Sequence, residues 1–231
     1  MEPFEPLSVQ LPDPYHSILR NGTLFPAGNQ NWFRRAWLRR SGCALIAAAD
    51  LLLYLRTSDC SSPLFRDLPP EGTIPGEAYD RYLERFCRRF PPAVPRLGMN
   101  AWTLCLGLNL CFRTCRLPYR ARWGVRRRRL WDEAEAMLGQ GLPVILCVGP
   151  NFPLFWRKNQ LTFYAREGDR LRPATRTKAH FVTITGLSQR WLRIVSWGQV
   201  YYIRKSEFMA YAERYSSYLL CNIVRIRKTQ S

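Results

Sequence analysis

The sequence predicts an α+β fold, with a helical half at residues 43–141 and an antiparallel sheet half at residues 142–226. Segments with apolar residues at helical spacing come first, and β-branched and aromatic runs separated by glycine or polar turns follow. Hydrophobic residues make up 47% of the 231 residues, which is enough for the core of one largish domain. We expect that domain at residues 28–231, after an extended arm at residues 1–27 that carries five prolines.

Four helices are expected in the helical half. The stretch 43–56 follows Gly42, consists largely of good helix formers and contains no proline. Residues 76–90 are amphipathic at the helical period and end at a Pro-Pro pair. A third helix is predicted around "GMNAWTLCLGLNLCFRTC", and a fourth at 126–141 begins with four arginines and closes at Gly141.

Strands are expected throughout the second half. The segment "LPVILCVG" at 142–149 is apolar throughout, which predicts a short, fully buried strand. Further strands are predicted from "LTFYAR", "AHFVTITGL", "WLRIVSWG" and "QVYYIRKSEF", and "YLLCNIVRIR" is expected to be the last. The segment "RPATRTKA" between the first two is interpreted as a polar loop.

The charge of the chain is strongly positive. Thirty-five Lys and Arg residues against seventeen Asp and Glu give a net charge of +18. An excess of this size predicts attraction to nucleic acid, to anionic membrane or to acidic peptides, and the alternative is that it serves only solubility. No nucleic-acid-binding motif accompanies the charge. The arginines at 126–129 are expected to form the solvated first turn of their helix, with a negatively charged partner as the alternative.

The eight cysteines favour a reducing compartment. Several lie within apolar segments, where a reduced thiol behaves as a small hydrophobic group. Cys111 and Cys115 are four residues apart, but no second Cys/His pair has ligand spacing, so we expect no metal and no cofactor. The first residues are acidic and proline-rich, unlike a signal peptide, and no apolar run reaches about 18 residues. A cytoplasmic protein without a membrane span is therefore expected.

One cysteine and one histidine are candidates for chemistry. Cys43 follows Gly42 at the predicted start of a helix, where backbone N–H groups stabilise a thiolate and can also bind an oxyanion. Of the two histidines, His16 lies in the proline-rich arm and is interpreted as a surface residue. His180 begins a predicted strand, and Ser196 ends another, where its hydroxyl could bond the imidazole. A Cys43–His180 pair is the hypothesis, and a buried structural thiol with a strand-edge histidine is the alternative.

The order of these segments resembles the papain-like cysteine peptidase superfamily. A cysteine at a helix start, a long helical middle, a "GLPVIL" strand, a histidine strand and "SWG" follow each other over residues 28–225. Within the superfamily, "SGCALIAAADLLLYL" is similar to the nucleophile segment of the C39-like branch, and "GNQNWF" at 28–33 resembles its upstream glutamine segment. The pattern is also similar to that of uncharacterised proteins of gut Clostridia. The resemblance implies a papain-like fold.

The resemblance also implies roles for individual residues. Cys43 would be the nucleophile, His180 the general base and acid, and Gln30 the side-chain donor to the oxyanion. Gln30 precedes the cysteine by more residues than in papain, so a neighbouring asparagine, Asn29 or Asn31, could replace it.

Two positions depart from the family pattern. Papain-like enzymes carry Asn or Asp before Ser-Trp-Gly, where this chain has Val195, so Ser196 is the nearest polar substitute. The glycine that follows the family's cysteine is Ala44 here. A hydroxyl orients an imidazole less firmly than an amide or a carboxylate does, which implies a weaker catalyst or an inactive one.

The sequence thus predicts a cysteine peptidase that cleaves a peptide or amide bond through an acyl-enzyme, with acidic peptides as one candidate substrate class. A thiol acyltransferase would use the same residues. The other alternative is a catalytically weak or inactive papain-like module that binds an anionic partner such as nucleic acid.

Overall fold

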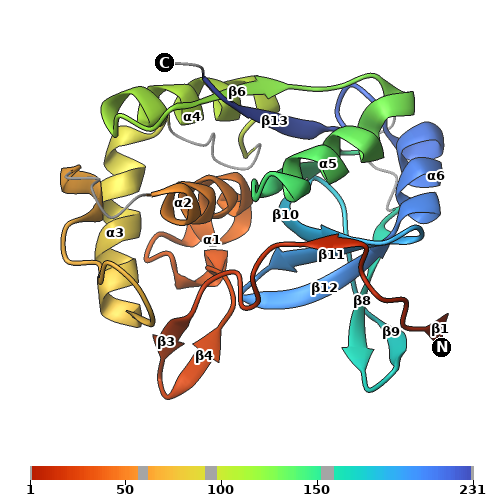
Figure 1. The fold of residues 1–231 in the computed structure, drawn as a ribbon, viewed down its shortest axis with the longest axis horizontal. Helices are drawn as coiled ribbons and strands as arrows, with labels where there is room; N and C mark the ends of the chain where they lie inside the picture. Colours follow the sequence, from red (N-terminus) through yellow and green to blue (C-terminus); the bar gives the residue numbers. More distant parts are fainter. Residues whose placement is uncertain (1, 57–61, 92–97, 152–158, 230–231) are drawn as a thin grey trace. The chain divides into compact units, whose positions relative to one another are not determined.

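The computed structural model of the chain describes residues 2–56, 62–91, 98–151 and 159–229. Within these ranges the structure is α+β, with six α-helices and one large antiparallel sheet (Figure 1), so the predicted fold class is confirmed at this level. The chain divides into two compact units, each made of several segments. Unit 1 contains Met1–Leu11, Trp123–Ser196 and Val200–Arg225, and unit 2 contains Pro12–Arg122, Trp197–Gln199 and Ile226–Ser231.

Unit 1 is built on the large sheet. The strands of the sheet lie in the order β1, β9, β8, β12, β11, β10, β7, β13 and β6 (Tyr119–Trp123), and β2 adds to β10. The predicted buried strands β7 (Val144–Val148) and β10 (His180–Leu187) pair with each other, and every residue of both is buried. The remaining strands are β1 (Glu2–Pro3), β2 (Val9–Gln10), β8 (Leu161–Glu167), β9 (Arg170–Thr177), β11 (Trp191–Ser196), β12 (Gln199–Arg204) and β13 (Ile223–Lys228).

The helix α5 (Leu130–Gly139) packs on β2, β7 and β10 of this sheet. The arginines predicted to form its first turn lie before it, in an exposed 3₁₀ turn at Arg127–Arg129. Asp132 and Glu133 occupy the first helical turn instead, where negative charge suits the helix dipole and arginine would oppose it. After the helix, Gly141 has the positive φ of 71° that a glycine cap provides, as predicted.

Two elements of unit 1 differ from the prediction. The strand expected to run through "QVYYIRKSEF" ends at Arg204, and α6 (Lys205–Tyr215) begins there and packs against β8. Its buried residues, Phe208, Tyr211 and Ala212, have helical spacing, which the prediction of a strand did not take into account. The expected polar loop is β9, which pairs with β8 along most of its length. Backbone hydrogen bonds, which do not require an apolar sequence, define such a polar strand.

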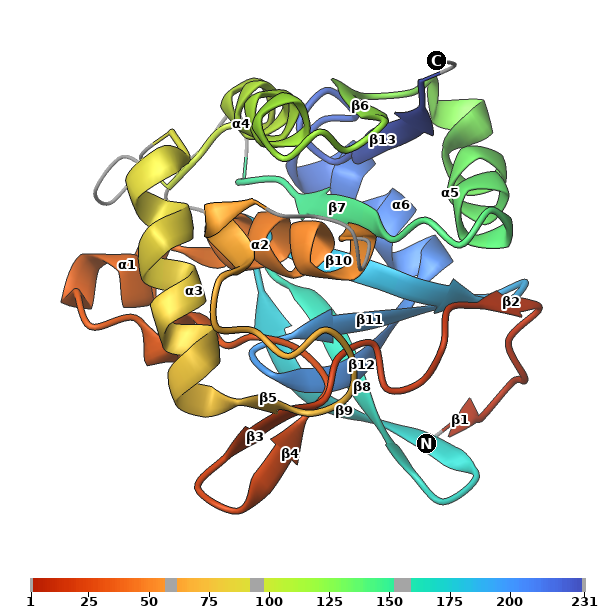
Figure 2. The same cartoon turned by 60° about the vertical axis from the view of Figure 1, so that its left-hand side comes forward.

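Unit 2 contains the other helices. The predicted helix at 43–56 is α2 (Cys43–Leu55), and it packs against α3 (Gly76–Arg89) and α4 (Ala101–Thr114), both also predicted (Figure 2). Almost every residue of α2 is buried, because its alanines let neighbouring segments approach closely. The short helix α1 (Ala36–Ser41), the strands β3 (Ile18–Arg20), β4 (Thr23–Phe25), β5 (Ile74–Pro75) and β6 (Tyr119–Trp123), and 3₁₀ turns at Gln30–Trp32 and Pro63–Phe65 complete the list.

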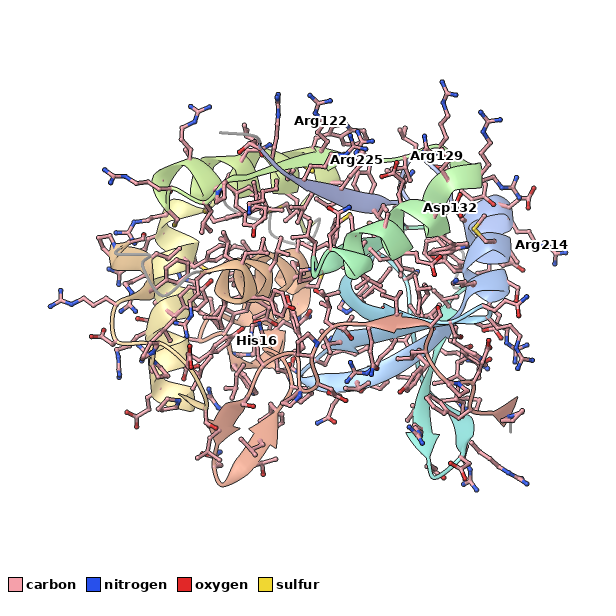
Figure 3. All side chains as sticks on the ribbon, viewed as in Figure 1. His16, Arg122, Arg129, Asp132, Arg214 and Arg225 are labelled. Atoms are coloured by element: carbon pink, nitrogen blue, oxygen red, sulfur yellow. The ribbon has the colours of Figure 1, made fainter. Side chains whose placement is uncertain are left out.

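The segment predicted to be an extended arm contributes short strands to both units. In unit 1, β1 pairs with β9 and β2 with β10. In unit 2, β3 and β4 form a hairpin that β5 extends in parallel. The interpretation of His16 as a surface residue is wrong, because its side chain is buried and its Nε2 lies 2.9 Å from the backbone oxygen of Asp50 (Figure 3).

Candidate functional site

Cys43 is the first residue of α2, in unit 2. Gly42 precedes it as the N-cap, and a Cβ on Gly42 would lie 2.5 Å from the Leu38 carbonyl oxygen and 2.6 Å from a carbon of the Phe33 ring. The close approach of α1 therefore requires glycine before the cysteine. Among the described cysteines, Cys43 and Cys87 are half-buried and the other five are buried, all as free thiols. Cys60 lies outside the described residues.

His180 and Ser196 are brought together in unit 1. His180 is the first residue of β10 and Ser196 is the last of β11, and these two strands are antiparallel neighbours. The imidazole Nε2 and the serine Oγ are 2.7 Å apart, a good hydrogen-bond distance. Both residues are buried, and burial lowers the pKa of His180 from 6.5 to about 3. The ring is therefore neutral at physiological pH and held by a hydroxyl.

Val195, which precedes Ser196 in β11, is buried and apolar. Adjacent strand residues point to opposite faces of a sheet, so Val195 and Ser196 face different ways. The polar group bound to His180 Nε2 is accordingly the hydroxyl of the next residue.

Gln30 lies in unit 2 within the 3₁₀ turn, and its side-chain nitrogen donates to the carbonyl oxygen of Arg39 in α1 at 2.7 Å. The neighbouring asparagines have different structural tasks. Asn29 caps the turn by accepting from the backbone N–H of Asn31, and its Nδ2 donates to the carbonyl oxygen of Trp197 at 2.8 Å. Trp197–Gln199, the turn that follows Ser196 in the chain, belongs to unit 2 as well.

Sequence reasoning missed the buried carboxyl group of Asp50, which lies seven residues after Cys43 on α2. It accepts hydrogen bonds from the backbone N–H of Gly28 at 2.8 Å and from the Tyr79 hydroxyl at 2.5 Å. Burial raises the pKa of Asp50 from 3.8 to about 7, against the opposing effect of these two bonds. A single acid within the apolar run "AAADLLLYL" was the available signal, since a buried carboxyl needs specific partners.

Asp50 anchors the segment that carries Gln30. Gly28 approaches so closely that a Cβ on it would lie 1.9 Å from the Tyr79 hydroxyl oxygen. The Gly28 carbonyl oxygen in turn accepts from the backbone N–H of Gly198 at 3.0 Å. Together with the bond from Asn29 to Trp197, this fixes the turn after Ser196 to the Asp50-bound segment.

A cavity of about 490 Å³ lies in unit 2 next to the residue before Cys43. Its lining includes Phe33, the ring that contacts Gly42. The remaining lining residues are Trp32, Arg34, Arg35, Leu38, Asp80, Leu83, Glu84, Cys87 and Arg88.

The charged residues of this cavity leave an excess of positive charge. Asp80 pairs with Arg20 at 2.7 Å, and Glu84 pairs with Arg34 at 3.1 Å. Arg35 and Arg88 form no ion pair with a carboxylate in the described part of the chain. The cavity therefore combines an apolar lining with guanidinium groups that an anionic ligand could bind.

In the described ranges, no group of three or more His, Cys, Asp or Glu side chains is arranged to hold a metal ion. No described helix is long and apolar enough to cross a membrane. Comparisons with protein-family models, with curated proteins and with solved structures find no match for this chain.

Proposed function

We propose that the protein is a papain-like thiol hydrolase, a cysteine peptidase with Cys43 as nucleophile and His180 as general base and acid. The hydrogen bond between His180 Nε2 and Ser196 Oγ carries the proposal, because a catalytic imidazole needs a partner that fixes its orientation. The half-buried position of Cys43 at the start of α2 supports it. The proposal requires Cys43 and His180, which belong to different units, to act as a pair.

The proposed reaction begins with proton transfer. When Nε2 donates its hydrogen to Ser196, Nδ1 carries the lone pair that accepts the thiol proton. The thiolate sulfur then bonds to the substrate carbonyl carbon, and the carbonyl electron pair moves onto oxygen. The backbone N–H of Cys43 stabilises this oxyanion, together with the second N–H of the Gln30 amide, since the bond to Arg39 uses only one of the two.

The protonated His180 then gives its proton to the leaving amine as the C–N bond breaks, which leaves an acyl-enzyme. Water, deprotonated by His180, attacks the thioester and releases the acid and the thiol. An amine in place of water would give acyl transfer by the same steps. Because burial disfavours the imidazolium, we expect slow turnover.

Thiol labelling tests the pair. A chloroacetamide probe, followed by peptide mapping, gives a separate labelling rate for each cysteine. We expect Cys43 to react faster than Cys87, the other half-buried thiol, whose pKa burial raises to about 11. His180→Ala should slow the Cys43 reaction about tenfold or more and leave Cys87 unchanged. Equal rates at Cys43 in the two proteins would exclude the pair.

The cavity beside Phe33 gives the proposal a substrate preference. Its apolar lining suits a large apolar side chain, and Arg35 and Arg88 suit an acidic residue next to it. Peptides with Leu or Phe beside Glu should therefore be cleaved faster than those with Lys at the same position. Arg88→Glu should remove that preference, whereas Arg89→Glu, on the same helix but outside the cavity lining, should keep it.

The second candidate function is a weak or inactive binding module for an anionic partner. Val195, apolar where the family has an amide or carboxylate, favours this alternative. Three observations together would support this module over the peptidase. The protein would hydrolyse no peptide, the probe would label Cys43 at a rate that does not depend on His180, and heparin would retain the protein in a salt-dependent manner.

A further inference from the structure

The helix α4 exposes a stripe of large apolar side chains. Trp102 is 51% exposed, Leu106 is 67% exposed and Leu110 is 45% exposed. Their spacing of four residues places them on one face of the helix. The opposite face is packed into unit 2 through Leu104, Leu108, Cys111 and Phe112, which are buried. α4 therefore has a second apolar face that the core of unit 2 does not use.

Arginines flank this stripe. α4 and β6 lie side by side (Figures 1 and 2). Asn109 links them, because its Nδ2 donates to the Ala121 carbonyl oxygen at 2.9 Å and its Oδ1 accepts from the Ala121 N–H at 2.8 Å. Ala121 is buried, so the residues on either side of it, Arg120 and Arg122, point to the other face and are exposed. Figure 3 labels Arg122 at the surface. Arg113 and Arg116, at the end of α4, are exposed as well. We call the apolar stripe and these four arginines the α4–β6 surface.

The four arginines of the α4–β6 surface have no paired carboxylate in the part of the chain that the structure describes. Residues 85–131 contain twelve arginines and neither Asp nor Glu. The surface thus presents apolar groups and charge of a single sign side by side.

We propose that the α4–β6 surface binds an anionic lipid bilayer from the aqueous side. Apolar side chains that project from a helix lying along the bilayer enter the boundary between headgroups and acyl chains. Arginines beside them bind the lipid phosphates, and their alkyl stems cover apolar surface while the guanidinium groups reach the headgroups.

Charge and exposure favour lipid over two other occupants. A second copy of the chain would bring two sets of arginines together, which repel. A nucleic acid would satisfy the arginines but offers Leu106 and Leu110 little apolar surface to bury. A lipid bilayer with negative headgroups accommodates both features.

Sedimentation with vesicles tests the proposal on the full-length protein. Binding is measured to vesicles of phosphatidylcholine alone and of phosphatidylcholine with 30% phosphatidylserine, at about 0.1 M and 0.5 M salt. We expect partitioning into the anionic vesicles that is at least about tenfold above that into neutral ones and that falls with salt. Equal partitioning into both vesicle types would overturn the proposal.

Surface substitutions separate the two components. Leu106→Ser with Leu110→Ser, and Arg120→Glu with Arg122→Glu, should each lower the partition coefficient by about tenfold or more. Leu24→Ser with Arg66→Glu, exposed residues outside the α4–β6 surface, serves as the control and should leave it unchanged. An equal loss in the control would overturn the proposal.

Two further measurements can also contradict it. Analytical ultracentrifugation that shows a dimer dissociated by the leucine substitutions would assign the stripe to a second copy. The protein could also bind a single-stranded oligonucleotide more tightly than anionic vesicles. If substitution of the arginines abolished that binding and substitution of the leucines did not, the surface would be assigned to nucleic acid.

Discussion

Replacing Asp50 with asparagine should change how the stability of the protein depends on pH. Burial raises the pKa of Asp50 to about 7 in the folded chain, against 3.8 for an exposed carboxyl group. Between pH 4 and 7 the folded protein therefore holds a proton at this site that the unfolded chain has released. The contribution of Asp50 to the wild-type free energy of unfolding should fall as pH rises through this window, by about 1.4 kcal/mol per pH unit.

The total effect follows from the two pKa values. The difference between about 7 and 3.8 corresponds to about 4 kcal/mol over the whole window. Asparagine cannot ionise, and its oxygen can still accept from the Gly28 N–H. The free energy of unfolding of Asp50→Asn, minus that of the wild type, should therefore rise by about 4 kcal/mol from pH 4 to pH 8.

Urea denaturation followed by circular dichroism, at half-unit steps from pH 4 to 8, measures this difference. The contributions of the histidines cancel, because both proteins contain them. Tyr79→Phe provides an independent check. It removes a hydrogen bond that lowers the pKa of Asp50, so the pH at which the Asp50 contribution levels off should move upward. A difference between Asp50→Asn and wild type that stays constant across the range would refute the reasoning.

Three other predictions concern stability. Gly28→Ala should lower the free energy of unfolding by about 2–3 kcal/mol, because its Cβ would overlap the Tyr79 hydroxyl. Gly139→Ala, in a helix with open space around the new Cβ, should be neutral or stabilise by about 0.5–1 kcal/mol. Equal costs of the two substitutions in urea denaturation would contradict the packing described for Gly28. Ser196→Ala leaves His180 Nε2 without its hydroxyl partner and should cost about 1–3 kcal/mol, compared with no measurable cost for Ser206→Ala on the exposed side of α6. Burial holds the pKa of His180 at about 3 and of His16 at about 4, below the usual 6.5, so the stability contributed by the two neutral rings should be complete above pH 6.5 and decrease as pH falls. Replacing either histidine with glutamine should remove about 3 kcal/mol of that decrease between pH 6.5 and 4, and an unchanged acid-unfolding curve would exclude this cause.

The elements with a strong apolar period were predicted well. α2, α3 and α4 match the expected helices to within a few residues, and β7 and β10 match the expected buried strands. β9 was missed because strand pairing is defined by backbone hydrogen bonds, which a polar sequence such as "RLRPATRT" can form. α6 was missed because the aromatic run before it has a strand pattern, and the change to helical spacing lies inside a continuous segment.

The candidate site shows the same division between local pattern and spatial arrangement. The neighbouring positions of His180 and Ser196 could be anticipated, since both were expected at the ends of strands in one antiparallel sheet. The buried hydrogen bonds of Asp50 and His16 could not be predicted, because each depends on groups from segments far apart in the chain. The bond from Gln30 to Arg39 likewise depends on α1, a short helix that has no clear sequence signal.

The sequence alone determined the α+β class, the order of the long helices and buried strands, the concentration of arginine in residues 85–131, and the choice of Cys43 and His180 as candidates. These features follow from the spacing and type of nearby residues, which the chain carries whatever its fold. Only the tertiary structure decided that a serine hydroxyl binds His180, that the Asp50 carboxyl group accepts a hydrogen bond from the Gly28 N–H within unit 2, and that α4 exposes a second apolar face. Burial and hydrogen bonding of a side chain depend on which distant segments surround it, and local pattern does not specify those neighbours.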